Sequence, residues 1–521
     1  MASSIYSGNT WSKLYVYSFY LLPVGLLFGE VPTSIAEFTI LGCWLLSKQW
    51  KNISVLYHNT YFTLLSLVYL LHLAGLLYTT DYSYALNDLR VKIPLILFPI
   101  MFFSSQIEKN YIVNLLKWYV VVVFINLAYL YIHCLLADKN LLDTRNVSLF
   151  ISHIRLGLIS AFAIVVAVYL VINSVVIQTE KLLWIIISAI ILVLMILLGL
   201  FTGIVSLVWA GMAAVIYLVF KKSSTFYVRL FLSLLLLFFI CSFIYIKKIY
   251  NKYFPEIEKV ELKSHTLNHQ PYRNEMLPYT ENGHLVMIHI CDAELKKEWE
   301  KRSELLFDAK DKKGNELKYT IYRYLASKGL TKDSAGIAQL SSQDIKNIEN
   351  GVPNYLYAQA SFLEKRIYEF IQEYKYFQYS KDPNGKTLVL RLFYWKIGWQ
   401  IWMKNFWLGV GTGDVKQSFE KEYQHYSFIQ KESQLRAHNQ FITIALTFGI
   451  FGLFIFLLVI FYPLIHLSKT SNYLLYLLFT SISILSFFID DTLETQPGVT
   501  FYAFFNSLLI YLCLSESKIK N

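Results

Sequence analysis

The stretch that decides the fold runs from Arg391 to Gly452, where a polar segment returns to a long apolar run. It begins RLFYWKIGWQIWMKNFWLGVGTGD at 391–414 and ends RAHNQFITIALTFGIFG at 436–452. Similar apolar runs recur along the chain, and a helix of about 20 apolar residues crosses roughly 30 Å of hydrocarbon. The runs are continuous, whereas the strands of an outer-membrane barrel would alternate apolar and polar residues. The sequence therefore predicts helices that span a membrane.

The composition supports the same class of protein. Hydrophobic residues make up 55% of the 521 residues and charged residues only 16%, with a mean hydropathy of +0.43. Soluble domains carry about 25% charged residues. We attribute the net charge of +11 to membrane topology, and we expect no nucleic-acid partner. No Cys or His spacing resembles a zinc site, so we predict no metal, no cofactor and no disulfide framework.

We predict an all-α polytopic membrane protein with about twelve transmembrane helices. The run at 182–220 would form a helix about 58 Å long, so we divide it at Thr202–Gly203. The weakest span is 91–104, which is short and contains two prolines. The first run shows no cleavage site and is taken as a span. The predicted spans are 14–28, 31–47, 61–78, 91–104, 118–137, 150–173, 182–200, 203–220, 227–246, 437–464, 471–489 and 498–514.

The spans divide the chain into four regions. Residues 1–246 hold the first nine spans, and 247–390 form a large loop domain with expected helical stretches at 293–310 and 355–378. Residues 391–436 form an interfacial helix and a Gly-rich turn, and 437–521 hold the last three spans. The Lys and Arg bias of the short loops predicts that both termini are cytoplasmic and that the loop domain is extracytoplasmic. The outer loops then carry the cations Arg90, Lys92, Lys139, Arg145 and Arg155.

Cations at the outer edge of the membrane are costly unless they snorkel to the headgroups or serve a site. Arg391, Arg436 and His438 lie where the chain re-enters the membrane, and His153 and Arg155 lie at the start of another span. These residues predict a site for an anionic, membrane-anchored substrate. Snorkelling is the alternative for each of them.

Three further patterns have two interpretations each. Trp395, Trp399 and Trp402 share a helical face, which suits an interfacial belt or a platform for a sugar. The turn GVGTGD, which contains Gly411, is either a tight turn or a backbone site for phosphate, and it lacks the ending of a nucleotide P-loop. The acidic stretch DDTLETQPG at 490–498 is either a solvated turn or the partner of the arginines. For this acidic stretch we expect the second interpretation, that it is the partner of the arginines.

Together these motifs resemble those of the O-antigen ligase/polymerase superfamily, and most closely the O-antigen ligase-like proteins of the Bacteroidota. The resemblance includes YRYLASKGL at 322–330 and DDTLETQPG. The family pattern is an Arg and a Trp, a turn, a His-Asn pair that opens a span, and Gly-x-x-Gly. Here these positions are Arg391, Trp395, the Leu408–Gly409 turn, His438, Asn439, Gly449 and Gly452.

The resemblance implies transfer of a glycan from undecaprenyl pyrophosphate to an acceptor sugar at the outer face of the bacterial inner membrane, with inversion and without a metal. The expected acceptor is lipid A–core. Arg391 is carried over as a pyrophosphate ligand and His438 as the acceptor-side residue. A second family arginine is missing where Phe201 stands, and we expect Arg155 to replace it. The further substrate-binding candidates are Arg436, His153, Arg90, Asn439, Trp395 and Gly411.

Two other functional classes remain open. An O-antigen or capsule polymerase and a protein O-oligosaccharyltransferase would use the same donor with another acceptor. A transporter of lipid-linked sugars would also have many spans and buried cations. Transporters tend to have repeated halves with broken helices, whereas this chain is asymmetric, so we expect an enzyme.

Overall fold

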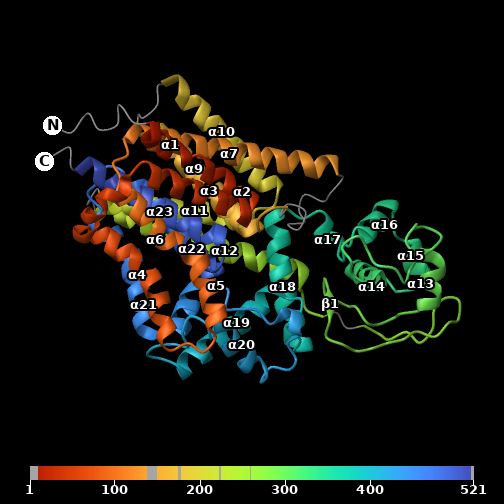
Figure 1. Ribbon diagram of the computed structural model, residues 1–521. Helices are drawn as coiled ribbons and strands as arrows, with labels where there is room; N and C mark the ends of the chain where they lie inside the picture. The colour runs from red at the N-terminus through yellow and green to blue at the C-terminus, as the bar shows by residue number, and fades with distance from the viewer. Residues whose placement is uncertain (1–9, 138–148, 174–177, 222–224, 258–259, 518–521) are drawn as a thin grey trace. The chain divides into compact units, whose positions relative to one another are not determined.

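The computed structural model describes residues 10–137, 149–173, 178–221, 225–257 and 260–517, and most of these residues are in helices (Figure 1). They form two compact units. The first comprises Met1–Val228 and Phe393–Asn521, and the second comprises Arg229–Leu392. The predicted all-α polytopic fold is confirmed. The predicted loop domain at 247–390 falls within the second unit.

Most helices of the first unit correspond to predicted apolar runs, whereas α5 and α20 do not. The helices of this unit are α1 (Thr10–Ser18), α2 (Leu21–Phe28), α3 (Glu30–Leu46), α4 (Thr60–Ala74), α5 (Tyr82–Lys92), α6 (Pro94–Phe103), α7 (Lys109–Leu136), α9 (His153–Ile172), α10 (Gln178–Leu197), α11 (Phe201–Lys221), α20 (Val415–Tyr423), α21 (Gln440–His466), α22 (Tyr473–Ile489) and α23 (Gln496–Ser517). Short 3-10 turns lie at Gln49–His58, Gly75–Leu77, Lys431–Ser433 and Thr492–Glu494 (η1 to η4). Two helices, α12 (Thr225–Tyr253) and α19 (Thr387–Lys404), cross the boundary between the units.

Eight helices in the described residues are long and apolar enough to cross a membrane. The other four predicted spans are shorter: α22 has 17 residues, α3 has 17 and α6 has 10, and the predicted span 14–28 is divided between α1 and α2. The eight candidates lie at Thr60–Leu77, Lys109–Leu136, His153–Ile172, Gln178–Leu197, Phe201–Lys221, Val228–Tyr253, Gln440–His466 and Gln496–Ser515.

The break in the long run at 182–220 lies slightly earlier than predicted. The helix α10 ends at Leu197, and Gly199 adopts a φ of 65°, a left-handed conformation that glycine accepts without a steric penalty. The helix α11 then starts at Phe201, not at Gly203. Gly203 instead lies against α9, where an added Cβ would come within 2.4 Å of the carbonyl oxygen of Gly157. The two glycines therefore allow α9 and α11 to touch.

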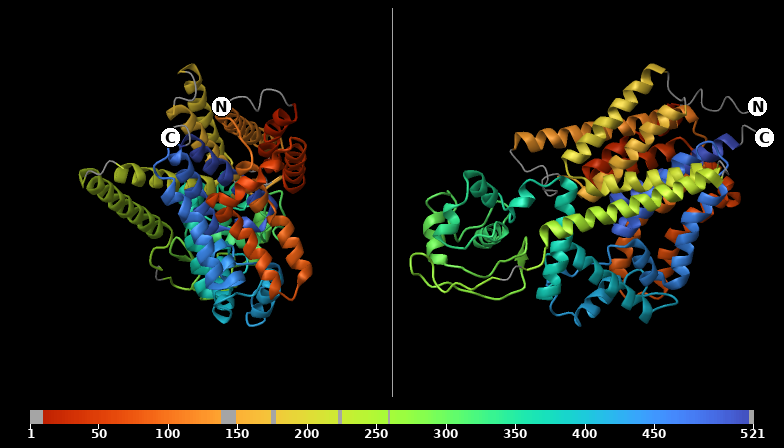
Figure 2. Two further views of the ribbon diagram at one scale, coloured as in Figure 1. Left: turned by 60° about the vertical axis from the view of Figure 1, so that its left-hand side comes forward. Right: turned by 180° about the vertical axis from the view of Figure 1, so that it is seen from behind.

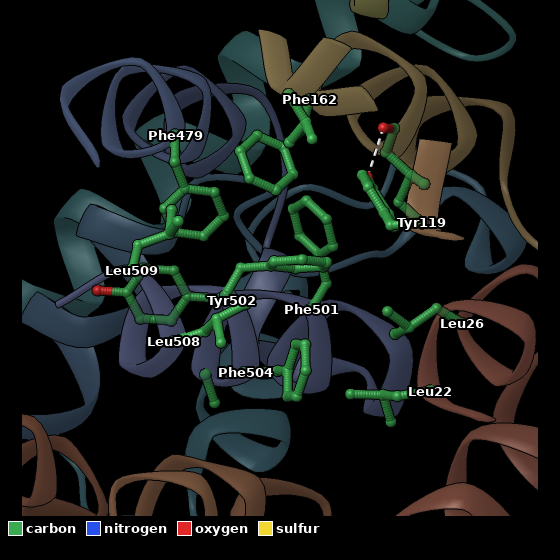
Figure 3. Packing of buried hydrophobic residues seen from close by; sticks show 14 of the residues in the cluster. Leu22, Leu26, Tyr119, Phe162, Phe479, Phe501, Tyr502, Phe504, Leu508 and Leu509 are labelled. Atoms are coloured by element: carbon green, nitrogen blue, oxygen red, sulfur yellow. Dashed lines mark hydrogen bonds between the residues drawn. The ribbon is translucent and has the colours of Figure 1, made fainter. Parts of the chain in front are cut away.

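The core of the first unit is aromatic and is centred on α23 (Figure 3). The ring of Phe505 lies 4.8 Å from that of Tyr119 and 4.9 Å from that of Phe162. Phe162 in turn contacts Phe479 of α22 at 5.0 Å. Tyr119 donates a hydrogen bond to the carbonyl of Ile159, so its polar end is satisfied (Figure 3).

The second unit folds around its own core. It contains most of α12, from Arg229 onward, and the short strands β1 (Thr280–Glu281) and β2 (His284–Leu285). Its other helices are α13 (Asp292–Trp299), α14 (Leu317–Ser327), α15 (Ser334–Ala338), α16 (Ser342–Glu349), α17 (Tyr355–Ala358) and α18 (Phe362–Ser380). Trp299, Leu325 and Ile348 are fully buried among the helices α13 to α16, which Figure 2 shows gathered in one cluster. The expected helix at 293–310 ends at Trp299, and 355–378 corresponds to α17 and α18.

Candidate active site

A pocket of about 320 Å³ lies within the first unit, and we call it the His438 pocket. Four segments that are far apart in the sequence form its wall: α5, the first turn of α9, the residues before α21, and the loop after α22. The lining residues are Tyr84, Asn87, Asp88, Val91, Arg155, Leu435, Arg436, His438, Asp490, Asp491, Glu494 and Thr495. The structure thus brings together three of the predicted site residues, namely Arg155, Arg436 and His438.

His438 is positioned by two neighbouring carboxylates. Its backbone has a φ of 47°, and its N–H donates to Asp491 Oδ2 at 2.9 Å. Its ring nitrogen Nδ1 lies 3.1 Å from Asp490 Oδ1. Burial raises the pKa of Asp490, but the hydrogen bond from His438 and the charge of Arg155 outweigh burial and hold that pKa below its ordinary value.

An ionised Asp490 can only accept hydrogen bonds, so Nδ1 of His438 must carry the proton that joins them. In neutral His438 the lone pair then lies on Nε2, for which no partner is found among the described residues. The His438 side chain is 31% exposed. The arrangement suits a general base that acts through Nε2.

Arg436 is held by the acidic loop, as the sequence predicted. Its Nη1 donates to Glu494 Oε2 at 2.6 Å, and its guanidinium lies 5.5 Å from the ring centre of Tyr84. Glu494 also accepts from Lys92 Nζ at 2.9 Å, and Lys92 contacts Asp88 at 2.5 Å. Attraction to Lys92 and Arg436 outweighs burial and keeps the pKa of Glu494 well below its usual range. Glu494 therefore remains ionised and fixes the Arg436 side chain.

Sequence analysis missed the role of Lys92. It is only 1% exposed, and it balances two buried carboxylates from beneath the pocket. The available signal was a lysine directly before an apolar run that begins with Ile93. Its partner Glu494 lies 402 residues away, so no local pattern could have paired them.

Arg155 enters the pocket from the first turn of α9, where Ser152 caps the helix by accepting from the Arg155 N–H. Its Nε is buried and has no hydrogen-bond partner among the described residues. A buried guanidinium N–H without an acceptor is unfavourable, so an anion bound here would gain a donor that is already in place.

Three of the other candidates lie outside the wall of this pocket, as far as the described residues show. His153 is two positions before Arg155 on α9, and residues at that spacing point to different faces of a helix. Arg90 is exposed and donates to Asn87 at 2.9 Å. Trp395 on α19 has a buried indole N–H without a partner, whereas Trp399 and Trp407 are largely exposed. Exposed tryptophans favour the interfacial belt.

Two candidates, Asn439 and Gly411, use polar groups in hydrogen bonds within the protein. Asn439 caps α21: its side chain accepts from the N–H groups of Phe441 and Ile442 and donates to the Phe488 carbonyl. Gly411 donates its N–H to the Thr447 carbonyl at 2.9 Å. The Gly411 N–H and the Asn439 side-chain oxygen are therefore already engaged within the protein.

The Gly-rich turn packs against a kink in α21. Gly449 interrupts the helix with a φ of 66°, and an added Cβ would lie 2.0 Å from the Trp407 carbonyl oxygen. The freed carbonyls of Leu446 and Thr447 accept from Val410 and Gly411. These contacts explain the glycines and favour the tight turn over a phosphate site.

Asp414 completes the turn. Its carboxylate accepts from the N–H groups of Thr80 and Asp81 and from the Thr80 hydroxyl, at 2.9 to 3.0 Å. Burial raises the pKa of Asp414, but these hydrogen bonds outweigh burial and lower it. The turn is therefore tied to the segment between α4 and α5.

Three other predicted residues, Arg391, Lys139 and Arg145, are not in the wall of the His438 pocket as far as the described residues show. Arg391 lies near the start of α19, one turn before Tyr394, and belongs to the second unit. Tyr394 belongs to the first unit, and its ring lies 5.6 Å from that of His438. Lys139 and Arg145, two of the predicted outer cations, lie outside the described residues.

Residues 343–457 match the family model described as O-antigen ligase. The match contains Arg391, Arg436 and His438, but it excludes Arg155 and the acidic loop that holds Asp490. It confirms the resemblance to the O-antigen ligase superfamily and supports a membrane glycosyltransferase of the ligase or polymerase type. None of the curated proteins matches the chain.

Proposed function

We propose that this protein transfers a glycan from undecaprenyl pyrophosphate to a sugar hydroxyl of lipid A–core at the outer face of the bacterial inner membrane. The observation that carries the proposal is the convergence of Arg155, Arg436 and His438 on one pocket, with His438 oriented by Asp490. The family match supports the reaction class.

On the donor side, the leaving pyrophosphate gains negative charge as the glycosyl bond breaks, and fixed guanidinium groups stabilise that charge. In this proposal Arg155 supplies the free Nε donor, and Arg436 supplies the nitrogens that Glu494 does not engage. Arg391 is included because of the resemblance. The pocket wall carries four carboxylates and two guanidinium groups, so binding would depend on directed hydrogen bonds and not on net charge.

Arg155 is also suitably placed to replace the arginine that is missing at Phe201. The helices α9 and α11 touch at Gly157 and Gly203. Because α10 returns the chain between them, α9 and α11 run in the same direction. Arg155 and Phe201 each lie two residues before the contacting glycine, so their backbones are at the same depth.

On the acceptor side, Nε2 of His438 takes the proton of the attacking hydroxyl. The acceptor oxygen forms a bond to the anomeric carbon of the donor. The bond from that carbon to the pyrophosphate oxygen breaks, and its electron pair leaves with undecaprenyl pyrophosphate. A single displacement inverts the configuration at the anomeric carbon. Asp490 acts as a positioning residue, because it holds His438 in the tautomer that this step needs.

The test is transfer by purified protein of a synthetic undecaprenyl-pyrophosphate glycan to lipid A–core. We expect transfer by the wild type and by Lys416→Ala, a control that removes an exposed cation from α20. Arg155→Ala, Arg391→Ala and His438→Ala should abolish it while the protein stays folded in detergent.

A parallel reaction offers the donor glycan itself as acceptor. If the wild type binds the donor but extends only this glycan, the ligase assignment is wrong and the enzyme is a polymerase. If purified protein moves labelled donor between the two leaflets of vesicles and never transfers its glycan, the chain is a transporter.

A further inference from the structure

A second pocket, of about 310 Å³, lies entirely within the second unit, and we call it the Tyr319 pocket. Its wall comes from a segment bridged to Ile290, from α13, from the loop after α13 and from α14. The lining residues are Arg273, Asp292, Ala293, Lys296, Phe307, Asp308, Lys318, Tyr319 and Tyr322.

Four of the five charged side chains of this wall form two ion pairs, and the fifth, Lys318, is paired with Glu316 outside the wall. Arg273 Nη1 lies 3.3 Å from Asp292 Oδ2, and Lys296 Nζ lies 2.6 Å from Asp308 Oδ2. All four side chains are 45% to 65% exposed. Exposed ion pairs stabilise a protein only weakly, so a ligand can replace one partner at little cost. The wall therefore offers donors and acceptors side by side.

An exposed aromatic ring stands beside these charges. Tyr319 is 47% exposed, and its ring meets the edge of the Tyr322 ring at 5.8 Å. Tyr322 is itself fixed, because its hydroxyl donates to Asp292. Lys318 Nζ lies 5.0 Å from the centre of the Tyr319 ring. The ring is thus held in place with much of its surface open.

We infer that the Tyr319 pocket binds an uncharged saccharide. A sugar ring has a C–H face that packs on an aromatic ring and a rim of hydroxyls that both donate and accept. Carboxylates accept from such hydroxyls, and Arg and Lys donate to them. A phosphate or an acidic sugar fits less well, because each cation of the wall already has a carboxylate partner, beside which a bound anion would have to lie.

The proposed function supplies two sources of this saccharide, the donor glycan and the acceptor core oligosaccharide, and this choice of ligands rests on that proposal. Both are tested with full-length protein in detergent. Each saccharide is prepared without its lipid, carries a diazirine and is cross-linked by light. The labelled peptides are then located by mass spectrometry, which separates labelling at this pocket from labelling at the His438 pocket.

We expect one of the two probes to label peptides within residues 292–322, and the probe that does so identifies the source. Tyr319→Ala should weaken this labelling about tenfold, the factor expected for loss of a stacked ring and its hydrogen bonds. Asp308→Ala should weaken it as well. Tyr374→Ala, which removes a 49% exposed tyrosine of α18 outside the pocket, should leave it unchanged.

The inference is overturned if neither probe labels this segment, if the Tyr319→Ala and Asp308→Ala proteins are labelled like the wild type, or if added salt removes the labelling. Salt dependence would show that charge drives the binding, not the sugar hydroxyls. None of these readouts requires transfer activity. Labelling that persists in a protein without transfer activity would refute the proposed function and leave this inference standing.

Discussion

Replacing Asp490 by Asn should remove the general base of the His438 pocket without removing a side chain from it. Asp490 Oδ1 lies 3.1 Å from His438 Nδ1, and as an ionised acceptor it requires a proton on Nδ1. The amide of Asn can donate to Nδ1 instead. Neutral His438 would then carry its proton on Nε2, where the acceptor hydroxyl needs a lone pair.

The magnitude follows from the role of that lone pair. General-base catalysis typically contributes about 10²- to 10⁴-fold, so kcat should fall by a factor in that range, which is roughly 3–5 kcal/mol of barrier. Donor affinity should stay the same or rise, because the substitution removes a negative charge from a pocket that also contains Arg155. A merely structural defect would lower both quantities.

The assay combines single-turnover transfer with equilibrium binding of a fluorescent donor. Asp490→Glu should restore part of kcat, because it returns an acceptor-only group. Asp491→Asn is the contrasting variant: Asp491 accepts from the backbone of His438 and Asn439 and from the Thr443 hydroxyl, so its loss should lower thermal stability. The reasoning is refuted if Asp490→Asn keeps kcat within about threefold of wild type, or if it loses kcat and donor affinity in parallel.

The remaining predictions concern the Gly-rich turn and metal dependence. Gly411→Ala should lower the free energy of unfolding by about 1–2 kcal/mol, because Gly411 has a φ of 90°. Donor affinity should be unchanged, because the Gly411 N–H is already bonded to the Thr447 carbonyl. A selective loss of donor affinity would restore the interpretation of the turn as a phosphate site. Asp414→Ala should destabilise the protein by about 1–3 kcal/mol at neutral pH, because three donors lose their acceptor. Since the folded-state pKa of Asp414 is lowered, the stability difference between wild type and variant should hold above the ordinary Asp pKa of about 4 and shrink as pH falls below that value. Thermal denaturation at several pH values would measure this difference. A difference that does not change with pH would contradict a stabilising role of the ionised carboxylate. EDTA should leave transfer unchanged, and strong inhibition would show that a divalent cation acts on the carboxylates of the His438 pocket.

The apolar runs alone determined that the chain is a bundle of helices long enough to span a membrane. The length of an apolar run and the polar residues that end it are local properties of the sequence. The ends of α4, α9 and α22 therefore fall within a few residues of the predicted limits. The break after α10 was displaced from Thr202–Gly203 to Gly199, because the pattern shows that a turn is needed but not which glycine adopts the left-handed conformation.

The motifs also predicted Arg436, His438 and Arg155 as site residues, since a cation at the membrane edge is conspicuous in the sequence. Their partners depend on which helix ends meet in space, and only the tertiary structure decided this. Asp490 reaches His438 across 52 residues, and Lys92 reaches Glu494 across 402. The same is true of Gly411, whose N–H finds the Thr447 carbonyl only because Gly449 kinks α21 and frees that carbonyl. Helix formation follows from neighbours along the chain, whereas ion pairs and tight turns follow from packing.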